Sequence, residues 1–152
     1  MILKTIDGSE FDLQIAGYQF PEIGNDEWDS NWLMIRVRIH SKAHTWEAVD
    51  PCMDTYEAND LCKWLNSLVE GQKLPPELEF LEPELRFKAT KITDNKVEVE
   101  IHCRYQLAPL ETYRTYNYEQ VFKFNLDKQT ASHAAEDWCS QVQKFPTRVQ
   151  RK

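Results

Sequence analysis

The stretch from Asp29 to Gly71 constrains the fold more than any other part of the chain. Between Trp32 and His40, every second residue is aliphatic, and the alternate positions are Trp32, Met34, Arg36, Arg38 and His40. The apolar face consists of Leu33, Ile35, Val37 and Ile39. A period of two residues is typical of a strand with one buried face. Thr45 to Val49 is expected to return beside it as an antiparallel partner.

A helix is predicted directly after this pair of strands. Asp50 and Pro51 are expected to break the second strand, and Asp54 and Glu57 have the spacing of a capping box. Apolar residues then recur at helical spacing: Ala58, Leu61, Cys62, Leu65, Leu68 and Val69. Gly71 is the expected left-handed stop. The stretch therefore predicts a hairpin followed by an amphipathic helix that packs on the sheet.

The rest of the chain adds further hairpins and a second helix. Asp7-Gly8 and Asp94-Asn95 are turn sequences between alternating segments, and Lys96 to Tyr105 alternates with Tyr105 inward and His102 outward. The stretch 127–145 has helical spacing. The predicted fold class is α+β, with an antiparallel sheet of about seven to eight strands and two amphipathic helices on one face. At 152 residues we expect a single domain over 1–147 and a short basic tail, 148–152, that frays.

Composition limits the location and the class of partner. The N-terminus lacks the apolar run of a signal peptide, and no stretch approaches the roughly 18 apolar residues of a membrane helix. We therefore expect a cytoplasmic protein whose four cysteines, Cys52, Cys62, Cys103 and Cys139, are reduced core thiols. A net charge of −7 disfavours direct binding to nucleic acid or to an anionic membrane, and is compatible with a basic partner.

The sequence contains none of the familiar catalytic or cofactor motifs. GxGxxG, GxxxxGK[ST], HExxH and GxSxG are all absent. His40 and His44 flank a turn, but local spacing offers no third metal ligand. We expect no enzyme, no metal and no cofactor.

Candidate partner-binding residues are aromatic or acidic and lie outside the predicted core. Trp28 lies in a polar loop, and a glutamate run is either a polar strand edge or a negative interaction surface. Tyr113, Arg114 and Tyr116 lie close together in the sequence, and tyrosine and arginine are common at interfaces. The two tyrosines could instead close over a sheet edge. The predicted contact residues are Trp28, Glu77, Glu79, Glu82, Glu84, Tyr113, Arg114 and Tyr116.

Five short elements occur in an order that resembles the WapI-type immunity proteins of bacteria. They are N-W-L from Asn31, D-P-C from Asp50, E-P-x-L-x-F from Glu82, H-x-R from His102 and F-P-x-R from Phe145. The resemblance covers about Asp29 to Arg148. It implies a cytoplasmic protein that binds and neutralises a cognate toxin domain, which in the best-known relative cleaves tRNA but need not be a nuclease here.

Two other function classes stay open from the sequence. A small-ligand or regulatory interaction domain would need a pocket, which could lie between sheet and helices near Trp46 and Trp64. An enzyme would need Asp50, His102 or Arg104 to cluster in a cleft with perturbed pKa values.

Overall fold

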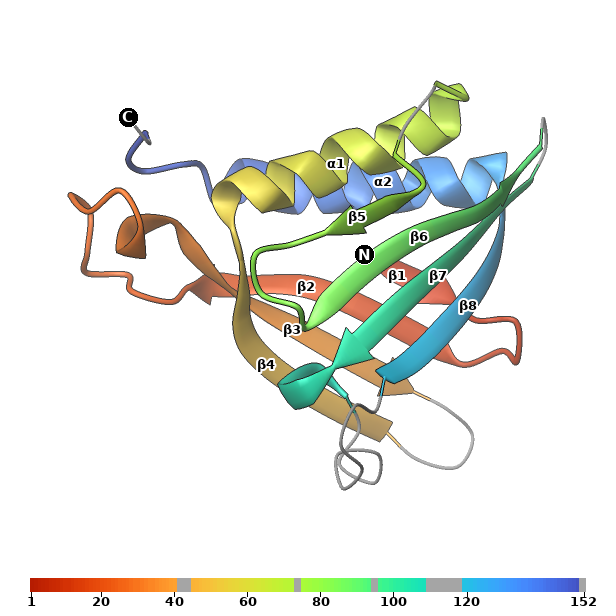
Figure 1. Cartoon of the computed structure of the whole chain (residues 1–152), viewed down its shortest axis with the longest axis horizontal. Helices are drawn as coiled ribbons and strands as arrows, with labels where there is room; N and C mark the ends of the chain where they lie inside the picture. Colours follow the sequence, from red (N-terminus) through yellow and green to blue (C-terminus); the bar gives the residue numbers. More distant parts are fainter. Residues whose placement is uncertain (41–44, 73–74, 94–95, 109–118, 151–152) are drawn as a thin grey trace.

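The chain folds into two antiparallel sheets and a pair of helices (Figure 1). The structure, a computed structural model, describes residues 1–40, 45–72, 75–93, 96–108 and 119–150. Within these ranges both sheets have four strands, in the order β1-β2-β3-β4 and β5-β6-β7-β8. The strands are β1 (Ile2–Lys4), β2 (Glu10–Tyr18), β3 (Trp32–His40), β4 (Thr45–Asp54), β5 (Glu77–Glu79), β6 (Leu85–Ile92), β7 (Lys96–Arg104) and β8 (Glu119–Asp127).

Each sheet is followed by one helix. The sequence shows no internal repeat, yet the order of four strands and a helix occurs twice. The helices are α1 (Thr55–Glu70) and α2 (Lys128–Lys144), with short 3₁₀ turns η1 (Asp29–Asn31) and η2 (Tyr105–Leu107). Figure 1 shows α1 and α2 side by side above the sheets, with β5–β8 in front of β1–β4. The α+β class and the eight strands are confirmed, and the strands divide between two sheets.

One hydrophobic core joins both sheets and both helices. The ring of Phe11 on β2 lies 5.3 Å from the ring of Phe122 and 5.7 Å from that of Phe124 on β8. Trp138 of α2 is fully buried, and its Nε1 donates to the carbonyl of Ala58 on α1, 3.0 Å away. The core therefore depends on contacts between the two halves of the chain. Among the described residues, no helix is long and apolar enough to cross a bilayer.

The predicted ends of α1 are confirmed. The Asp54 carboxylate accepts from the backbone N–H groups of Tyr56 and Glu57, and the Glu57 side chain accepts from the N–H of Asp54. This completes a capping box. At the other end Gly71 has φ +67°, the left-handed conformation that glycine adopts without steric cost.

The predicted C-terminal ends of β4 and β7 are wrong. Strand β4 continues through Pro51 to Asp54, because β4 is an edge strand with a register shift opposite Leu33 and Ile35. Proline is tolerated at sheet edges and bulges, because the backbone N–H that it lacks is not needed there for a hydrogen bond between strands. Tyr105 does not continue the inward face of β7: its φ is +48°, it starts η2, and its side chain is half exposed.

The expectation of four reduced core thiols is also wrong. Cys62 of α1 and Cys139 of α2 form a disulfide across 77 residues of sequence, with Cα atoms 5.2 Å apart. Neither local spacing nor composition identifies this pair, because only the packing of the two helices brings the sulfurs together. Cys52 and Cys103 are the buried free thiols. Burial raises the pKa values of both, so they stay protonated.

Candidate partner-binding surface

The loop before β3 exposes a tryptophan on an ordered backbone. The Asp26 carboxylate accepts hydrogen bonds from the N–H groups of Trp28 (2.8 Å) and Asp29 (2.7 Å). These two bonds lower the pKa of Asp26, so the carboxylate stays charged. The Trp28 side chain is nevertheless 51% exposed. The loop therefore holds a large aromatic side chain at the surface.

Residues near the C-terminus form hydrogen bonds with Asn31, at the end of this loop. Asn31 is fully buried; its Oδ1 accepts from the N–H of Arg148 (2.9 Å), and its Nδ2 donates to the carbonyls of Val149 (2.7 Å) and Glu27 (3.1 Å). The N-W-L and F-P-x-R elements thus meet through Asn31 and Arg148. The prediction that the tail frays is wrong for Arg148 and Val149.

A second acidic segment lies at the connection between β5 and β6. Leu81 is 65% exposed, and its N–H donates to the Glu57 carboxylate of α1, 2.5 Å away. Burial raises the pKa of Glu84, and the nearby Asp50 and Glu82 carboxylates raise it further. Burial and Glu82 likewise raise the pKa of Asp50. The carboxylates of Asp50, in the D-P-C element, and of Glu82 and Glu84, in the E-P-x-L-x-F element, therefore repel one another.

Both segments lie near the start of α1. Consecutive residues of α1 reach them: Glu57 accepts from Leu81, and the Tyr56 hydroxyl lies 3.4 Å from the carbonyl of Val149, which Asn31 also contacts. Figure 1 shows the loop before β3 at the left of the molecule, next to the start of α1, and the β5–β6 connection below α1, nearer the middle. We call the loop 21–29, the segment 81–84 and Asp50 the acidic end.

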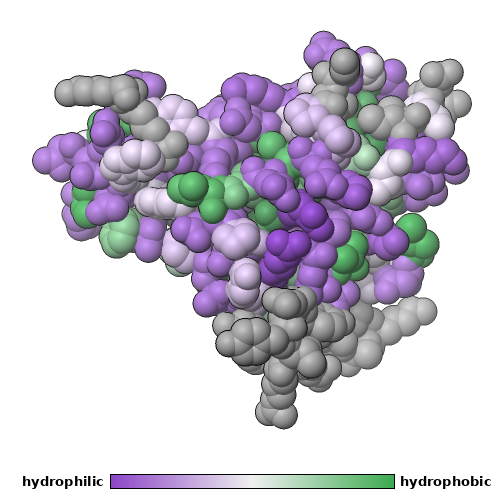
Figure 2. Space-filling model, in the orientation of Figure 1, coloured by the Kyte–Doolittle hydropathy of each residue, from purple (hydrophilic) through white to green (hydrophobic). Residues whose placement is uncertain are grey.

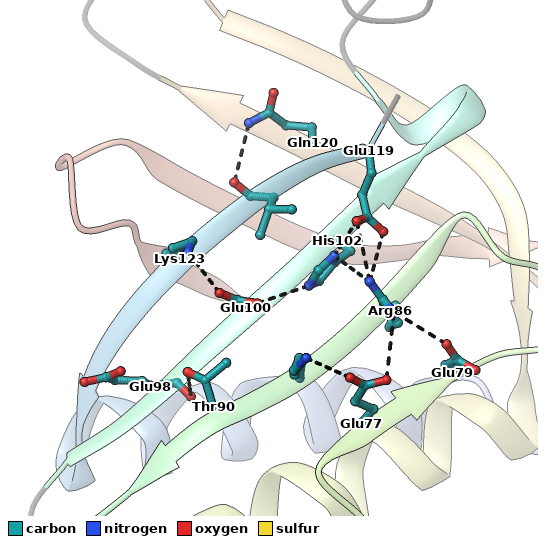
Figure 3. Close-up of polar contacts among 12 residues, drawn as sticks. Glu77, Glu79, Arg86, Thr90, Glu98, Glu100, His102, Glu119, Gln120 and Lys123 are labelled. Carbon is teal, nitrogen blue, oxygen red and sulfur yellow. Dashed lines mark hydrogen bonds and ion pairs between the residues drawn. The ribbon is translucent and has the colours of Figure 1, made fainter. Parts of the chain in front are cut away.

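Glu77 and Glu79 have a different environment, although they belong to the same glutamate run. The Lys88 ammonium lies 2.9 Å from one oxygen of Glu77, and this hydrogen bond lowers the pKa of Glu77 (Figure 3). The Arg86 guanidinium lies 3.8 Å from the carboxylates of both Glu77 and Glu79. Their charges are therefore largely compensated by cations of β6.

A network of charged residues extends from Arg86 on β6 to residues of β7 and β8 on the outer face of the β5–β8 sheet (Figure 3). The Glu119 carboxylate of β8 contacts Nη2 of Arg104 (2.5 Å), Nδ1 of His102 (2.9 Å) and Nη2 of Arg86 (3.2 Å). Burial acts to raise the pKa of Glu119, but His102 and Arg104 outweigh it and lower the pKa. His102 is only 6% exposed, because these side chains and Glu100, 3.4 Å from its Nε2, surround it. Alternation along β7 predicts that His102 points away from the core, but it does not predict that neighbouring charged side chains bury it.

Comparison with known proteins decides the family. The model of the WapI-like immunity protein family matches residues 1–146. The chain belongs to the WapI-like immunity protein family. The match starts earlier than the elements from Asp29 onward, so the first hairpin is part of the family domain, and it ends two residues before Arg148.

A shorter similarity involves a much longer protein. Over 68 residues the chain is 38% identical to "Protein retinal degeneration B" of Drosophila melanogaster. This stretch covers 43% of the chain and 4% of that relative. No solved structure matches the chain.

The structure also places the residues of the two alternative function classes. The His102 and Arg104 side chains contact the Glu119 carboxylate, whereas the Asp50 carboxylate interacts with those of Glu82 and Glu84. The N–H of Arg104 donates to the carbonyl of Glu84 at 2.9 Å, so the two groups are neighbours through the backbone and their side chains have different partners. Trp64 is buried against Phe87 and donates to the carbonyl of Pro75, and Trp46 packs at the core border. These two tryptophans therefore contribute to packing.

Tyr113, Arg114, Tyr116 and His44 lie outside the described residues. Within the described part of the chain, no group of three or more His, Cys, Asp or Glu residues could hold a metal ion.

Proposed function

We propose that this protein binds a cognate bacterial toxin domain in the cytoplasm and neutralises it by occupying a surface that the toxin needs. The observation that carries the proposal is the family match over residues 1–146 of the 152-residue chain. Immunity of this kind requires a stable complex and no chemistry by the immunity protein itself. We therefore propose a binding protein without a catalytic role.

The charge of the chain supports a basic toxin. At −7 the protein attracts a positively charged domain, which raises the association rate more than it changes the affinity. A nuclease fits this description, because proteins that bind the phosphates of nucleic acid present lysine and arginine. The proposal includes no direct contact of this protein with nucleic acid or membrane.

The proposed contact residues differ in how much charge they can offer a partner. Trp28, Glu82 and Glu84 belong to the acidic end, whereas Glu77 and Glu79 are paired with β6 cations. Glu77 and Glu79 could still contribute through the β5 edge. Tyr113, Arg114 and Tyr116 remain proposed contacts by residue type alone.

A cytoplasmic location affects the Cys62–Cys139 pair. Cytoplasmic thiol buffers keep most cysteines reduced. The helices are also joined by the buried Trp138 and its hydrogen bond to Ala58, so the reduced protein retains the contact between α1 and α2. The proposed function therefore does not depend on the disulfide.

Growth rescue tests the proposal. The C-terminal domain of a large surface or secreted protein encoded beside this chain is expressed in a bacterial host, with and without the chain. We expect growth to stop without the chain and to resume with it. Continued toxicity despite well-folded, abundant chain would reject the pairing, and a purified complex distinguishes neutralisation from reduced toxin expression.

A further inference from the structure

The acidic end combines exposed apolar side chains with carboxylates. Trp28 and Leu81 are among the large hydrophobic residues most exposed in the described chain, at 51% and 65%. Figure 2 shows small hydrophobic areas separated by hydrophilic surface on one face of the molecule. Interfaces concentrate binding energy in a few large side chains, tryptophan above all, that lie within a polar rim.

The backbone at Trp28 is held by hydrogen bonds within the protein. Asp26 holds the backbone at Trp28, and the buried Asn31 connects the loop to Arg148 and Val149. The Arg148 guanidinium donates to the carbonyl of Ile23 at 2.7 Å, so the loop is tied at both ends. A loop whose backbone is already ordered loses less conformational entropy on binding. Trp28 is therefore suited to act as a contact residue.

The charges of the acidic end favour a cationic partner. The loop 21–29 contains four carboxylates, Glu22, Asp26, Glu27 and Asp29, and no lysine or arginine. Arg148 donates to the carbonyls of Phe20, Pro21 and Ile23, so one guanidinium charge lies beside the four carboxylates of the loop and leaves an excess of negative charge.

The second segment adds carboxylates that lack compensation. Glu84 keeps one buried oxygen without a hydrogen-bond partner in the described structure. Burial raises the pKa of Glu84, and the Asp50 and Glu82 carboxylates raise it further. An approaching lysine or arginine would relieve this repulsion.

We propose that the acidic end is the toxin-binding surface and that it contacts a lysine- and arginine-rich patch of the toxin domain, with Trp28 as the central apolar contact. The proposal rests on the proposed function and adds the location of the interface and the charge of the partner surface. An arginine or lysine of the partner can lie over the Trp28 ring, an arrangement that the surrounding carboxylates also favour.

The test separates charge from apolar contact. The probe is the toxin domain encoded beside this chain, with its active site inactivated, and binding to the full chain is followed by surface plasmon resonance at several salt concentrations. The charge variant is Glu22→Lys with Glu82→Lys, two exposed positions in the two segments. The matched control is Glu70→Lys with Glu136→Lys, two exposed helix positions with the same change in net charge.

We expect the charge variant to slow association about tenfold more than the control at low salt, with the difference vanishing at high salt. Trp28→Ala is expected to weaken affinity by about 10- to 100-fold, mostly through faster dissociation, and Trp28→Phe should recover much of it. Circular dichroism verifies that each variant is folded.

The outcomes distinguish this inference from the proposed function. If wild type rescues growth and binds, but the acidic-end variants bind as the control does, the interface lies elsewhere and the inference is wrong. If wild type neither rescues nor binds, the proposed function fails and the inference fails with it.

Discussion

The guanidinium of Arg148 lies 3.6 Å from the centre of the Tyr18 ring and donates to the carbonyls of Phe20, Pro21 and Ile23. One side chain near the C-terminus thus ties together the end of β2 and the loop that exposes Trp28. The Tyr18 hydroxyl completes the contact by donating to the carbonyl of Pro146 at 2.5 Å. Removing this arginine should loosen the loop and leave the sheets intact.

Arg148→Ala is therefore expected to lower the free energy of unfolding by about 1–3 kcal/mol, since charge-assisted hydrogen bonds and a cation–π contact are lost together. Amide hydrogen exchange in the loop 19–31 should accelerate more than exchange in the strands. The control is Arg38→Ala, which removes an exposed ion pair with Glu47 and should cost about 0–1 kcal/mol. Equal effects of the two substitutions on unfolding and on loop exchange would contradict this role of Arg148.

The Cys62–Cys139 disulfide predicts a redox-dependent stability. Reduction should lower the free energy of unfolding by about 2–4 kcal/mol, because the unfolded chain loses a long-range crosslink. Urea unfolding with and without reductant measures this difference. The double variant Cys62→Ser, Cys139→Ser should match the reduced protein and be insensitive to reductant; a persisting response to reductant would assign the effect to another cysteine.

The pKa of Glu84 predicts an unusual pH effect. Because the folded-state pKa is raised, the folded protein takes up the proton more readily than the unfolded chain, so this group favours folding at low pH and opposes it as pH rises through the folded pKa. Glu84→Gln should therefore raise Tm at neutral pH, and the gain should disappear as pH falls below about 4.3, the ordinary glutamate pKa. Glu70→Gln is an exposed control. A lower Tm for Glu84→Gln at neutral pH would show that the charge is stabilising there.

Glu119 should have the opposite pH dependence. Its pKa is lowered, mainly by His102 and Arg104 acting against burial, so its stabilisation is present above the unfolded pKa and is lost as pH falls through the folded pKa. Glu119→Gln is expected to cost about 1–3 kcal/mol at neutral pH, since it leaves three cationic or polar partners without a charged acceptor. Acid unfolding curves test this: the cost should shrink below the folded pKa, and a constant cost across pH would mean that packing rather than charge is responsible.

Local patterns predict much of the fold. The alternation of Val97, Val99, Ile101 and Cys103 predicts the buried face of β7, and Asp54, Glu57 and Gly71 predict both ends of α1. These features depend on neighbours within a few residues, which a sequence displays directly.

The remaining features depend on contacts between distant residues. Pro51 is accommodated because β4 is an edge strand, and Cys62 meets Cys139 because α1 packs on α2. The polar neighbours of Trp28 predict a surface residue, but the contact between Asn31 and Arg148 that supports its loop joins residues more than a hundred positions apart. Likewise, the glutamate run reads as one feature, and only strand pairing shows that Glu77 is neutralised while Glu84 is not.

The most direct test of the central claim is a titration of purified toxin domain with this protein, followed by the activity of the toxin. Neutralisation by binding predicts that activity falls in proportion to added protein and reaches its minimum at equimolar amounts, with the complex isolated by gel filtration. Full toxin activity in the presence of excess folded protein, or inactivation by a small fraction of an equivalent, would contradict the account.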